Sequence, residues 1–280
     1  MTATERKACV IGWPISHSRS PIIHNHWLRH YGIPGRYDRV PVRPEDLSAL
    51  LGDLRVHGYV GCNVTVPHKE EAFRLVEAEG TAARRTGTVN TVYLKGGRPV
   101  GRSTDGEGFL ESLRAGVPGW SPERAAVALI GAGGAARAVA AALADAGVGE
   151  IAVFNRTPER AFALAADLGP PLAVRPWGAL GDFLSGTDLL VNTTSLGMAG
   201  QPSLVLPLDR LRRETVVADI VYVPLETPLL ASARARGNRT VDGLGMLMHQ
   251  AVPGFELWFG VRPEVTPELR ALVAADIANG

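Results

Sequence analysis

The chain has 280 residues, and its 29 Lys and Arg against 28 Asp and Glu give a formal net charge of +1. This length fits one large domain or two ordinary ones. The near-neutral charge gives no case for a nucleic-acid or membrane-surface partner, and no apolar run approaches the roughly 18 residues that span a bilayer. The two cysteines, Cys9 and Cys62, are too few for a disulfide framework or a metal quartet. We therefore expect a cytoplasmic protein without a metal site.

Strands and helices are predicted to alternate along most of the chain. The first part predicts strands over 7–12, 37–42 and 60–66, helices over 20–31, 44–55 and from 67, and a hairpin over 90–102. The second part restarts near residue 105, with a helix over 106–115, strands over 126–130, 151–154, 189–192 and 216–220, and helices over 134–146 and 158–168. From about residue 242 the pattern is helical, over 245–259 and 267–277. This rhythm predicts an α/β fold of two lobes with parallel sheets covered on both faces, plus a helical tail.

A glycine-rich turn joins the strand over 126–130 to the helix that follows. Its sequence is Gly131-Ala132-Gly133-Gly134-Ala135-Ala136. Strand, turn, helix and second strand fit within about thirty residues, as a dinucleotide-binding βαβ unit requires. Gly131 would allow the tight turn, Gly133 the approach of a pyrophosphate, and Ala136 close packing of helix on strand. The N–H groups of the helix N-terminus would bind the phosphates, whereas the alternative is a plain tight turn.

The residues after the next strand indicate which dinucleotide binds. An NAD site commonly has Asp or Glu there for the ribose 2′-hydroxyl. This chain has Asn155-Arg156-Thr157, with Arg160 one helical turn further on. Cations and neutral donors suit a 2′-phosphate, which a carboxylate would repel. We therefore expect NADP(H) rather than NAD; the alternative is that both arginines are ordinary solvated side chains.

The most informative segment of the first lobe is Cys62-Asn-Val-Thr-Val-Pro-His-Lys69, which contains one of only three lysines in the chain. Thr65 and Lys69 fall at the carboxyl end of a buried strand, where open α/β sheets bind ligands. A lysine in a partly closed cleft can act as a general acid or base, whereas an arginine cannot. The alternative is an exposed lysine paired with a neighbouring glutamate. Ser18 and Ser20 begin a helix and would seat a small carboxylate, although Ser20 is also a natural N-cap.

These segments together resemble the shikimate dehydrogenase family, in order and over essentially the whole chain. The matching segments are 12–21, 63–71, 89–91, 104–106, 131–136, 155–157 and 242–247, followed by Gln250. One departure is Ser103, where the family usually has Asn before Thr-Asp; a serine keeps only part of the amide's hydrogen-bonding pattern next to Asp105.

The resemblance implies NADPH-dependent, reversible reduction of 3-dehydroshikimate to shikimate by hydride transfer, in the pathway to chorismate and the aromatic amino acids. It implies that Lys69 and Asp105 form the catalytic pair. The substrate would be bound by Ser18, Ser20, Thr65, Lys69, Asn90, Asp105, Tyr222 and Gln250. The cofactor NADP(H) would be bound by Gly131, Ala132, Gly133, Gly134, Ala135, Asn155, Arg156, Thr157, Arg160, Ile220, Gly243 and Met246.

The resemblance also implies two domains and leaves alternatives in function. The substrate-binding, catalytic domain would comprise residues 1–104 plus 242–280, with the C-terminal helices packing back on the first lobe, and the Rossmann-like NADP-binding domain residues 105–241. We expect a monomer or homodimer. The alternatives are a quinate or dual quinate/shikimate dehydrogenase, and a non-catalytic NADPH sensor on the same fold. Ser20 and the arginines favour shikimate and NADP, and a sensor would need neither Lys69 nor Asp105.

Overall fold

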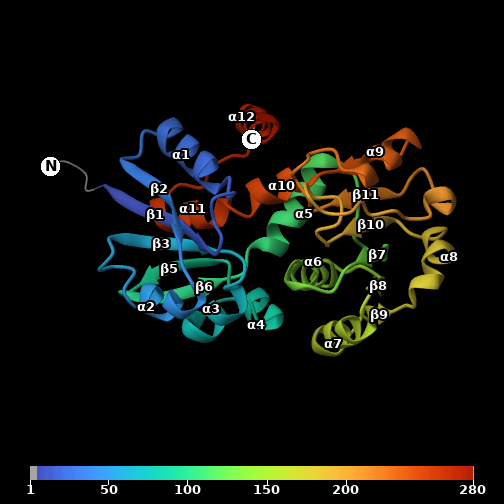
Figure 1. Ribbon diagram of the computed structural model, residues 1–280, viewed down its shortest axis with the longest axis horizontal. Helices are drawn as coiled ribbons and strands as arrows, with labels where there is room; N and C mark the ends of the chain where they lie inside the picture. Colours follow the sequence, from blue (N-terminus) through green and yellow to red (C-terminus); the bar gives the residue numbers. More distant parts are fainter. Residues whose placement is uncertain (1–4, 280) are drawn as a thin grey trace. The chain divides into compact units, whose positions relative to one another are not determined.

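The computed structural model describes residues 5–279. Contacts within the chain divide these residues into two units, the first comprising 5–104 and 250–273, the second 105–249 and 274–279. Each unit contains one six-stranded sheet with its own helices (Figure 1). The predicted α/β fold with two lobes is confirmed.

The sheet of the first unit has the order β2-β1-β3-β5-β6-β4. Its strands are β1 (Arg6–Gly12), β2 (Gly35–Pro41), β3 (Tyr59–Val64), β4 (Glu77–Ala78), β5 (Thr91–Lys95) and β6 (Arg98–Arg102). Its helices are α1 (Ser20–His30), the 3-10 turn η1 (Pro44–Asp46), α2 (Leu47–Gly52), α3 (Lys69–Leu75), α4 (Thr81–Thr86) and α11 (Val252–Phe259). Strand β1 runs parallel to β2 and β3, whereas β5 is antiparallel to β3 and β6.

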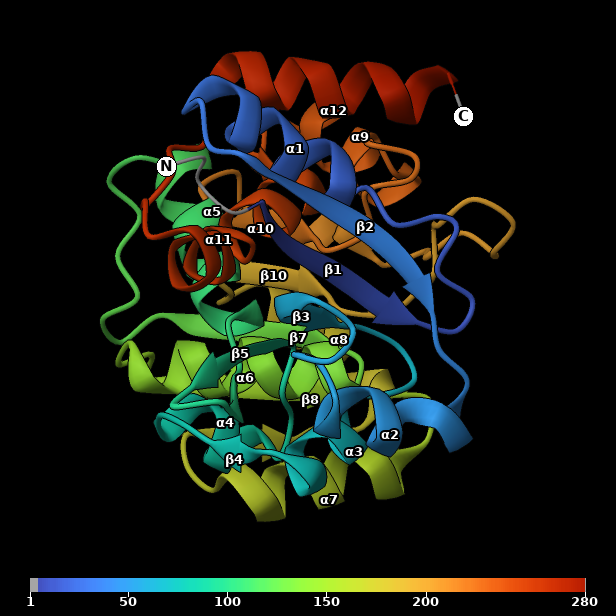
Figure 2. The same cartoon turned by 90° about the vertical axis from the view of Figure 1, so that its left-hand side faces the viewer.

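Both faces of this first sheet are covered. Helices α1 and α11 lie on one face and α2, α3 and α4 on the other (Figures 1 and 2). Consequently Cys9, Val10 and Ile11 of β1 are all buried, which explains the continuous apolar run in the sequence. The indole of Trp258 in α11 donates a hydrogen bond to Val92 O at 2.9 Å. It also fills the space above Gly61, where an added Cβ would lie 2.1 Å from Trp258 Nε1.

The sheet of the second unit is parallel throughout, in the order β12-β11-β10-β7-β8-β9. Its strands are β7 (Ala126–Ile130), β8 (Glu150–Phe154), β9 (Leu172–Val174), β10 (Leu189–Asn192), β11 (Val216–Asp219) and β12 (Thr240–Val241). Its helices are α5 (Asp105–Gly116), α6 (Gly134–Asp145), α7 (Pro158–Leu168), η2 (Trp177–Ala179), α8 (Leu180–Leu184), η3 (Leu208–Arg210), α9 (Pro228–Ala235) and α10 (Gly243–His249). The last part of α12 (Pro267–Asn279), residues 274–279, also belongs to this unit. One apolar core joins this sheet to α5, α6 and α7, and another joins it to α8 and α9. This strand order is that of the doubly wound dinucleotide-binding fold.

Several helix boundaries differ from the predictions. Helix α1 has Arg19 at its N-cap, so Ser20 is its first residue and does not cap it. Helix α3 begins at Lys69 rather than at Pro67. The helix predicted over 245–259 is two helices, α10 and α11, because Pro253 lacks an N–H and is accommodated only in the first turn of a new helix. Elements β4, α4, β9, α8, α9 and β12 were not predicted.

The return of the chain to the first unit also differs from the predicted boundary. The sequence placed this return at residue 242, but residues 242–249 belong to the second unit, as do 274–279. The reason is a close contact between α10 and α5, since a Cβ added at Gly245 would lie 2.1 Å from Ser112 Oγ. Helix α11, in contrast, packs on the first unit as expected.

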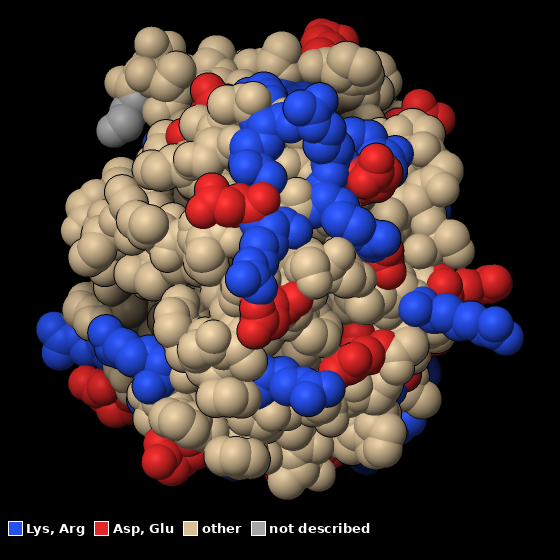
Figure 3. Space-filling view, turned by 90° about the vertical axis from the view of Figure 1, so that its right-hand side faces the viewer, with Lys and Arg blue, Asp and Glu red and all other residues tan. Residues whose placement is uncertain are grey.

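The surface of the described residues carries mixed charge. Figure 3 shows Lys and Arg gathered on one face with Asp and Glu among them. Exposed ion pairs include Arg212 with Asp188, at 2.6 Å, and Arg234 with Glu226. Between residues 5 and 279, no helix has the length and apolar character needed to cross a membrane.

Candidate active site

Two loops of the first unit meet where β1 and β3 end. Trp13 N donates to Val66 O at 3.2 Å, and Thr65 N donates to Ile11 O at 3.0 Å. A Cβ on Gly12 would lie 2.7 Å from Thr65 Cγ2, so only glycine allows this approach. The loop that leads to Ser18 and the loop that carries Thr65 therefore lie side by side at the carboxyl ends of parallel strands, where ligands bind in open α/β sheets.

Ser18 and Ser20 lie at the start of α1. Ser18 Oγ accepts a hydrogen bond from Ser20 N at 3.3 Å, and Ser18 O accepts one from Arg39 Nε at 2.8 Å. The N-cap residue of α1 is Arg19, which forms no side-chain cap bond, so the Ser20 hydroxyl does not cap the helix. Two hydroxyls beside a helix N-terminus form a suitable seat for a carboxylate.

Lys69 is the first residue of α3 and is half-buried. Its carbonyl accepts a hydrogen bond from Val89 N at 3.0 Å. The preceding residue, His68, is buried, and its Nε2 lies 2.8 Å from Val42 O. Contacts on both sides therefore fix the backbone from which the Lys69 side chain extends.

Three polar residues from distant parts of the chain meet in a buried group, which we call the amide cluster: Asn90, Thr104 and Gln250. Asn90 Oδ1 accepts from Thr104 N at 2.7 Å, and Asn90 Nδ2 lies 3.2 Å from Gln250 Oε1. Thr104 Oγ1 donates to Gln250 O at 2.8 Å. The cluster adjoins the end of β3, because Val64 N donates to Asn90 O at 2.8 Å. The structure thus brings two predicted site residues, Asn90 and Gln250, next to the strand that leads to Thr65 and Lys69.

Thr104→Val is expected to destabilise the protein by about 1–3 kcal/mol. The Thr104 hydroxyl donates to Gln250 O and accepts from Asn90 Nδ2 at 3.0 Å, and valine leaves both groups buried without this partner. Urea denaturation measures the loss. Thr104→Ser retains the hydroxyl and serves as the control; equal stability of the valine variant and the wild type would contradict this account of the cluster.

Two predicted substrate residues belong to the second unit. Asp105 directly follows Thr104, is buried, and begins α5. Tyr222 is half-buried in the segment after β11. Asp105 is thus joined by one peptide bond to a member of the amide cluster.

The glycine-rich turn of the second unit has the geometry that a bound pyrophosphate requires. Gly131 has φ +111°, and its N–H donates to Phe154 O at 2.9 Å. A Cβ there would lie 2.7 Å from Thr193 Oγ1, after the neighbouring strand β10. Helix α6 begins at Gly134 with no side-chain cap, and a Cβ on Gly133 or Gly134 would meet no described atom within 4 Å. Open space above unbonded helix N–H groups fits the phosphates of a dinucleotide.

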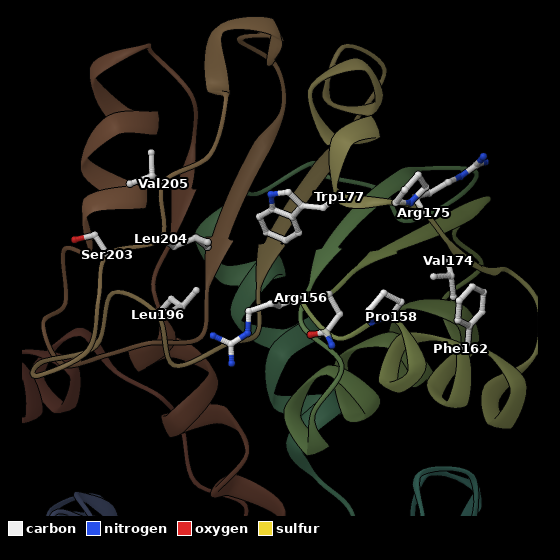
Figure 4. A pocket seen from close by; sticks show the side chains of 12 residues that line it. Arg156, Pro158, Phe162, Val174, Arg175, Trp177, Leu196, Ser203, Leu204 and Val205 are labelled. Carbon is white, nitrogen blue, oxygen red and sulfur yellow. The ribbon is translucent and has the colours of Figure 1, made fainter.

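The segment after β8 carries the residues expected to bind a 2′-phosphate. Asn155 Nδ2 donates to Thr157 O at 2.7 Å, and Thr157 is the N-cap residue of α7 without a side-chain cap bond. Arg156 and Arg160 are exposed, and neither forms an ion pair within the described part of the chain. Asn155 and Arg156 line a cavity of about 760 Å³, and the described residues of its wall include no acidic one (Figure 4). This donor set fits a phosphate and would not select a ribose hydroxyl.

The remaining predicted cofactor residues are placed around the end of β11. Gly243 lies against Ile220, since a Cβ there would be 2.1 Å from Ile220 O. Met246, one turn further along α10, packs against the core of the second unit. Ile220 also packs against this core, so all three residues belong to the second unit.

Sequence reasoning missed several buried polar residues that hold the strand ends. Asp219 accepts hydrogen bonds from Asn192 Nδ2 at 2.9 Å and from Thr227 Oγ1 at 2.7 Å, and burial raises its pKa above the ordinary value. Asn63 accepts from Tyr37 Oη at 2.6 Å and donates to Asn90 O at 3.1 Å. The sequence feature that could have indicated these residues is a single Asn or Asp within an otherwise apolar strand. Within residues 5–279, no group of three or more His, Cys, Asp and Glu side chains is arranged to hold a metal ion.

Comparisons with known proteins match this arrangement. Residues 10–92 match the model of the shikimate dehydrogenase substrate binding domain, 119–224 that of shikimate / quinate 5-dehydrogenase, and 243–272 that of the shikimate 5′-dehydrogenase C-terminal domain. The shikimate dehydrogenase (NADP(+)) of Paramagnetospirillum magneticum is 57% identical over 274 residues, covering 98% of this chain and 99% of the relative.

Two solved structures show the same fold. The shikimate 5-dehydrogenase of Thermus thermophilus, in complex with NADP(H) and shikimate, is 38% identical with a TM-score of 0.85, covering 97% of this chain and 99% of the other. The quinate dehydrogenase of Corynebacterium glutamicum, in complex with NAD, is 31% identical with a TM-score of 0.89, also covering 97% and 99%.

Proposed function

The chain belongs to the shikimate dehydrogenase family, and from this we propose that it catalyses the NADPH-dependent, reversible reduction of 3-dehydroshikimate to shikimate. The single observation that carries the proposal is the amide cluster beside β3, the strand that leads to Thr65 and Lys69. A ring with several hydroxyls needs such convergent, fixed donors and acceptors. The reaction belongs to the pathway to chorismate and the aromatic amino acids.

The substrate residues divide by the chemistry they offer. Ser18 and Ser20 bind the carboxylate, assisted by Tyr222. Thr65 and the amides of Asn90 and Gln250 bind the ring hydroxyls, with Lys69 and Asp105 at the hydroxyl that is formed or oxidised. Support comes from the placement of Asn90 and Gln250 in one buried cluster and of both serines at the start of α1.

Lys69 and Asp105 donate and accept the proton of the reaction. In the reductive direction, Lys69 donates a proton to the carbonyl oxygen, and its positive charge stabilises the negative charge that develops there. Asp105 positions the ammonium group of Lys69 as its negatively charged partner. The proton is then held by the pair of residues and not by Lys69 alone. In the oxidative direction the same pair accepts the proton of the hydroxyl. NADPH, when bound, supplies the hydride.

The second unit is the proposed NADP-binding domain. Gly131, Ala132, Gly133, Gly134 and Ala135 bind the pyrophosphate through the turn and the start of α6. The 2′-phosphate is bound by Asn155, Arg156, Thr157 and Arg160, and the nicotinamide lies by Ile220, Gly243 and Met246. These roles are supported by the open space at Gly133 and Gly134 and by the charge of both arginines, which has no ion-pair partner among residues 5–279.

Arg156→Ala is expected to weaken NADP⁺ binding by about 10-fold or more, and NAD⁺ binding by less than about twofold. The reason is that a hydrogen bond to a charged group contributes about 1.5–3 kcal/mol and only NADP⁺ carries the 2′-phosphate. Steady-state KM values for both cofactors measure the difference. An equal loss for NADP⁺ and NAD⁺ would remove Arg156 from the 2′-phosphate site.

Nicotinamide absorbance tests the function itself, with shikimate or quinate paired with NADP⁺ or NAD⁺. We expect turnover of shikimate with NADP⁺ to exceed all other pairs. Quinate is the second candidate, because the Corynebacterium glutamicum enzyme shares the fold, and quinate differs by a hydroxyl beside the carboxylate that Ser20 would face. Activity only with quinate would overturn the choice of substrate, and no activity with any pair would favour an NADPH sensor.

We also propose that the enzyme works in the cytoplasm, as a monomer or homodimer and without nucleic-acid or membrane partners. The net charge of +1 and the small-molecule substrate support this proposal.

A further inference from the structure

An exposed indole lines the cavity that contains Arg156. Trp177, at the start of η2, is 45% exposed, although a large aromatic side chain usually gains by burial. Its indole and the side chains of Leu196 and Leu204 point towards the same space, with Arg156 at the edge (Figure 4). These four side chains combine a flat aromatic surface, an apolar wall and one cation.

The topology places this cavity at one end of the expected dinucleotide site. Arg156 follows β8, Trp177 follows β9, and Leu196 and Leu204 belong to the segment after β10. All three strands are parallel, so these residues extend from the carboxyl edge of one sheet. Neighbouring strands are about 4.8 Å apart, which puts Trp177 one strand further than Arg156 from the glycine-rich turn after β7.

Two arginines line the cavity, Arg156 and Arg175, and Arg156 is the one that we expect to bind an anion. Arg175 also lines the cavity, but its guanidinium pairs with Glu150 at 2.6 Å. Arg156 forms no ion pair among residues 5–279. The cavity therefore suits a ligand with a flat ring and, close to that ring, one phosphate group.

Resting on the proposed NADP-dependent function, we propose that Trp177 is the stacking platform for the adenine ring of the cofactor. The ring lies on the indole with its edge towards Leu196 and Leu204, while Arg156 binds the 2′-phosphate of the same nucleoside. Trp177 then contributes affinity that NADP⁺ and NAD⁺ share, and Arg156 contributes affinity that only NADP⁺ receives. Preference for NADP⁺ and overall affinity for adenine dinucleotides are thus set by different residues.

Isothermal titration calorimetry with cofactor fragments tests this division of roles in the full-length protein. The ligands are 2′,5′-ADP and 5′-AMP, which differ in the 2′-phosphate, and nicotinamide mononucleotide, which lacks adenine. Trp177→Ala is expected to raise Kd for both adenine ligands by the same factor, about 10-fold, and to leave Kd for nicotinamide mononucleotide unchanged. Arg156→Ala raises Kd for 2′,5′-ADP alone. Trp177→Phe retains a stacking ring and stays within about threefold of the wild type.

Phe162→Ala is the matched control. Phe162 is an exposed aromatic residue that lines the same cavity, but it lies beyond Pro158 and next to Val174 in Figure 4. Its removal is expected to change no Kd by more than about twofold. Tryptophan fluorescence gives a second readout, because quenching by 5′-AMP should disappear in Trp177→Phe although binding persists.

The outcomes separate this inference from the proposed function. If the wild type binds 2′,5′-ADP and Trp177→Ala binds it equally well, the role of Trp177 is wrong and the NADP site stands. If Phe162→Ala loses affinity and Trp177→Ala does not, the adenine lies elsewhere in the cavity and the inference also fails. If the wild type binds neither adenine ligand and shows no turnover, the proposed function fails with it.

Discussion

Lys69→Ala is expected to lower kcat by about 10²–10⁴-fold, with a much smaller change in KM for shikimate. The substitution removes both the proton donor and the positive charge that stabilises the developing alkoxide. Binding of the substrate is shared with Ser18, Ser20 and the amide cluster, so ground-state affinity depends less on this one side chain. Initial rates in both directions measure the effect.

Lys69→Arg distinguishes the two contributions of the lysine. Arginine retains the positive charge but does not exchange its proton at cellular pH, so turnover should stay near that of the alanine variant. Lys95→Ala is the control, because Lys95 is an exposed lysine that pairs with Glu79 at 2.9 Å. Near-normal turnover of purified, folded Lys69→Ala would exclude Lys69 from the chemistry.

Asp105→Asn is expected to reduce kcat comparably, because the amide cannot share the proton of the lysine. The asparagine side chain is nearly the same size as the native carboxylate, so the start of α5 should be preserved, and circular dichroism checks this. If this variant turned over at the wild-type rate while Lys69→Ala did not, Lys69 would act without Asp105.

The protein is expected to lose about 4 kcal/mol of stability through His24 alone when the pH falls from 7 to 3. His24 is completely buried, stacked on Tyr37 with ring centroids 4.0 Å apart and surrounded by Trp27, Phe255 and Trp258. Burial lowers the pKa of His24 from 6.5 to about 3, and Asn63 acts in the opposite direction without offsetting the effect of burial. Between these two values the unfolded chain binds a proton that the folded chain does not, so the free energy of unfolding decreases as the pH falls.

Urea denaturation at several pH values between 7 and 3 measures this contribution as a difference between variants. His24→Phe replaces the ring without a titratable group, so its stability should fall less steeply with pH than that of the wild type. His30→Phe is the matched control, since His30 is exposed on the same helix, and its pH dependence should follow the wild type. Identical slopes for His24→Phe and the wild type would show that His24 does not stay neutral in the folded state.

The parts of the fold that sequence predicted best are those with strong periodicity. The strands at 126–130 and 189–192 and the helix over 158–168 have the predicted bounds, because each is a buried apolar run or an amphipathic helix that starts with proline. The short elements β4, β9 and β12 have two or three residues each, too few for any period to emerge. Their formation depends on pairing with strands that are far away in the sequence.

The residues of the candidate site likewise fall into those that the sequence could indicate and those that it could not. Lys69, Ser20 and Gly131 could be proposed as site residues from the sequence, because each stands in a local motif at the end of a strand or the start of a helix. Thr104 and Trp177 were not identifiable as site residues, because their roles depend on neighbours supplied by other parts of the chain. The predicted boundary at 242 differs from the division of the structure for the same reason, since contacts between distant segments, such as those of Gly245 with Ser112 and of Gly243 with Ile220, assign α10 to the second unit.

The insertion of the second unit within the first has a consequence for biosynthesis. Trp258 covers Gly61 and bonds to Val92, yet it is translated more than 150 residues after β6 ends at Arg102. At about 5–20 residues per second, roughly 8–30 seconds separate these two points on the ribosome. During this interval α1 already covers part of this face of the sheet, but the part that α11 later covers does not yet have that helix. The nascent protein must therefore keep this sheet from associating with other chains while the intervening unit is still being made.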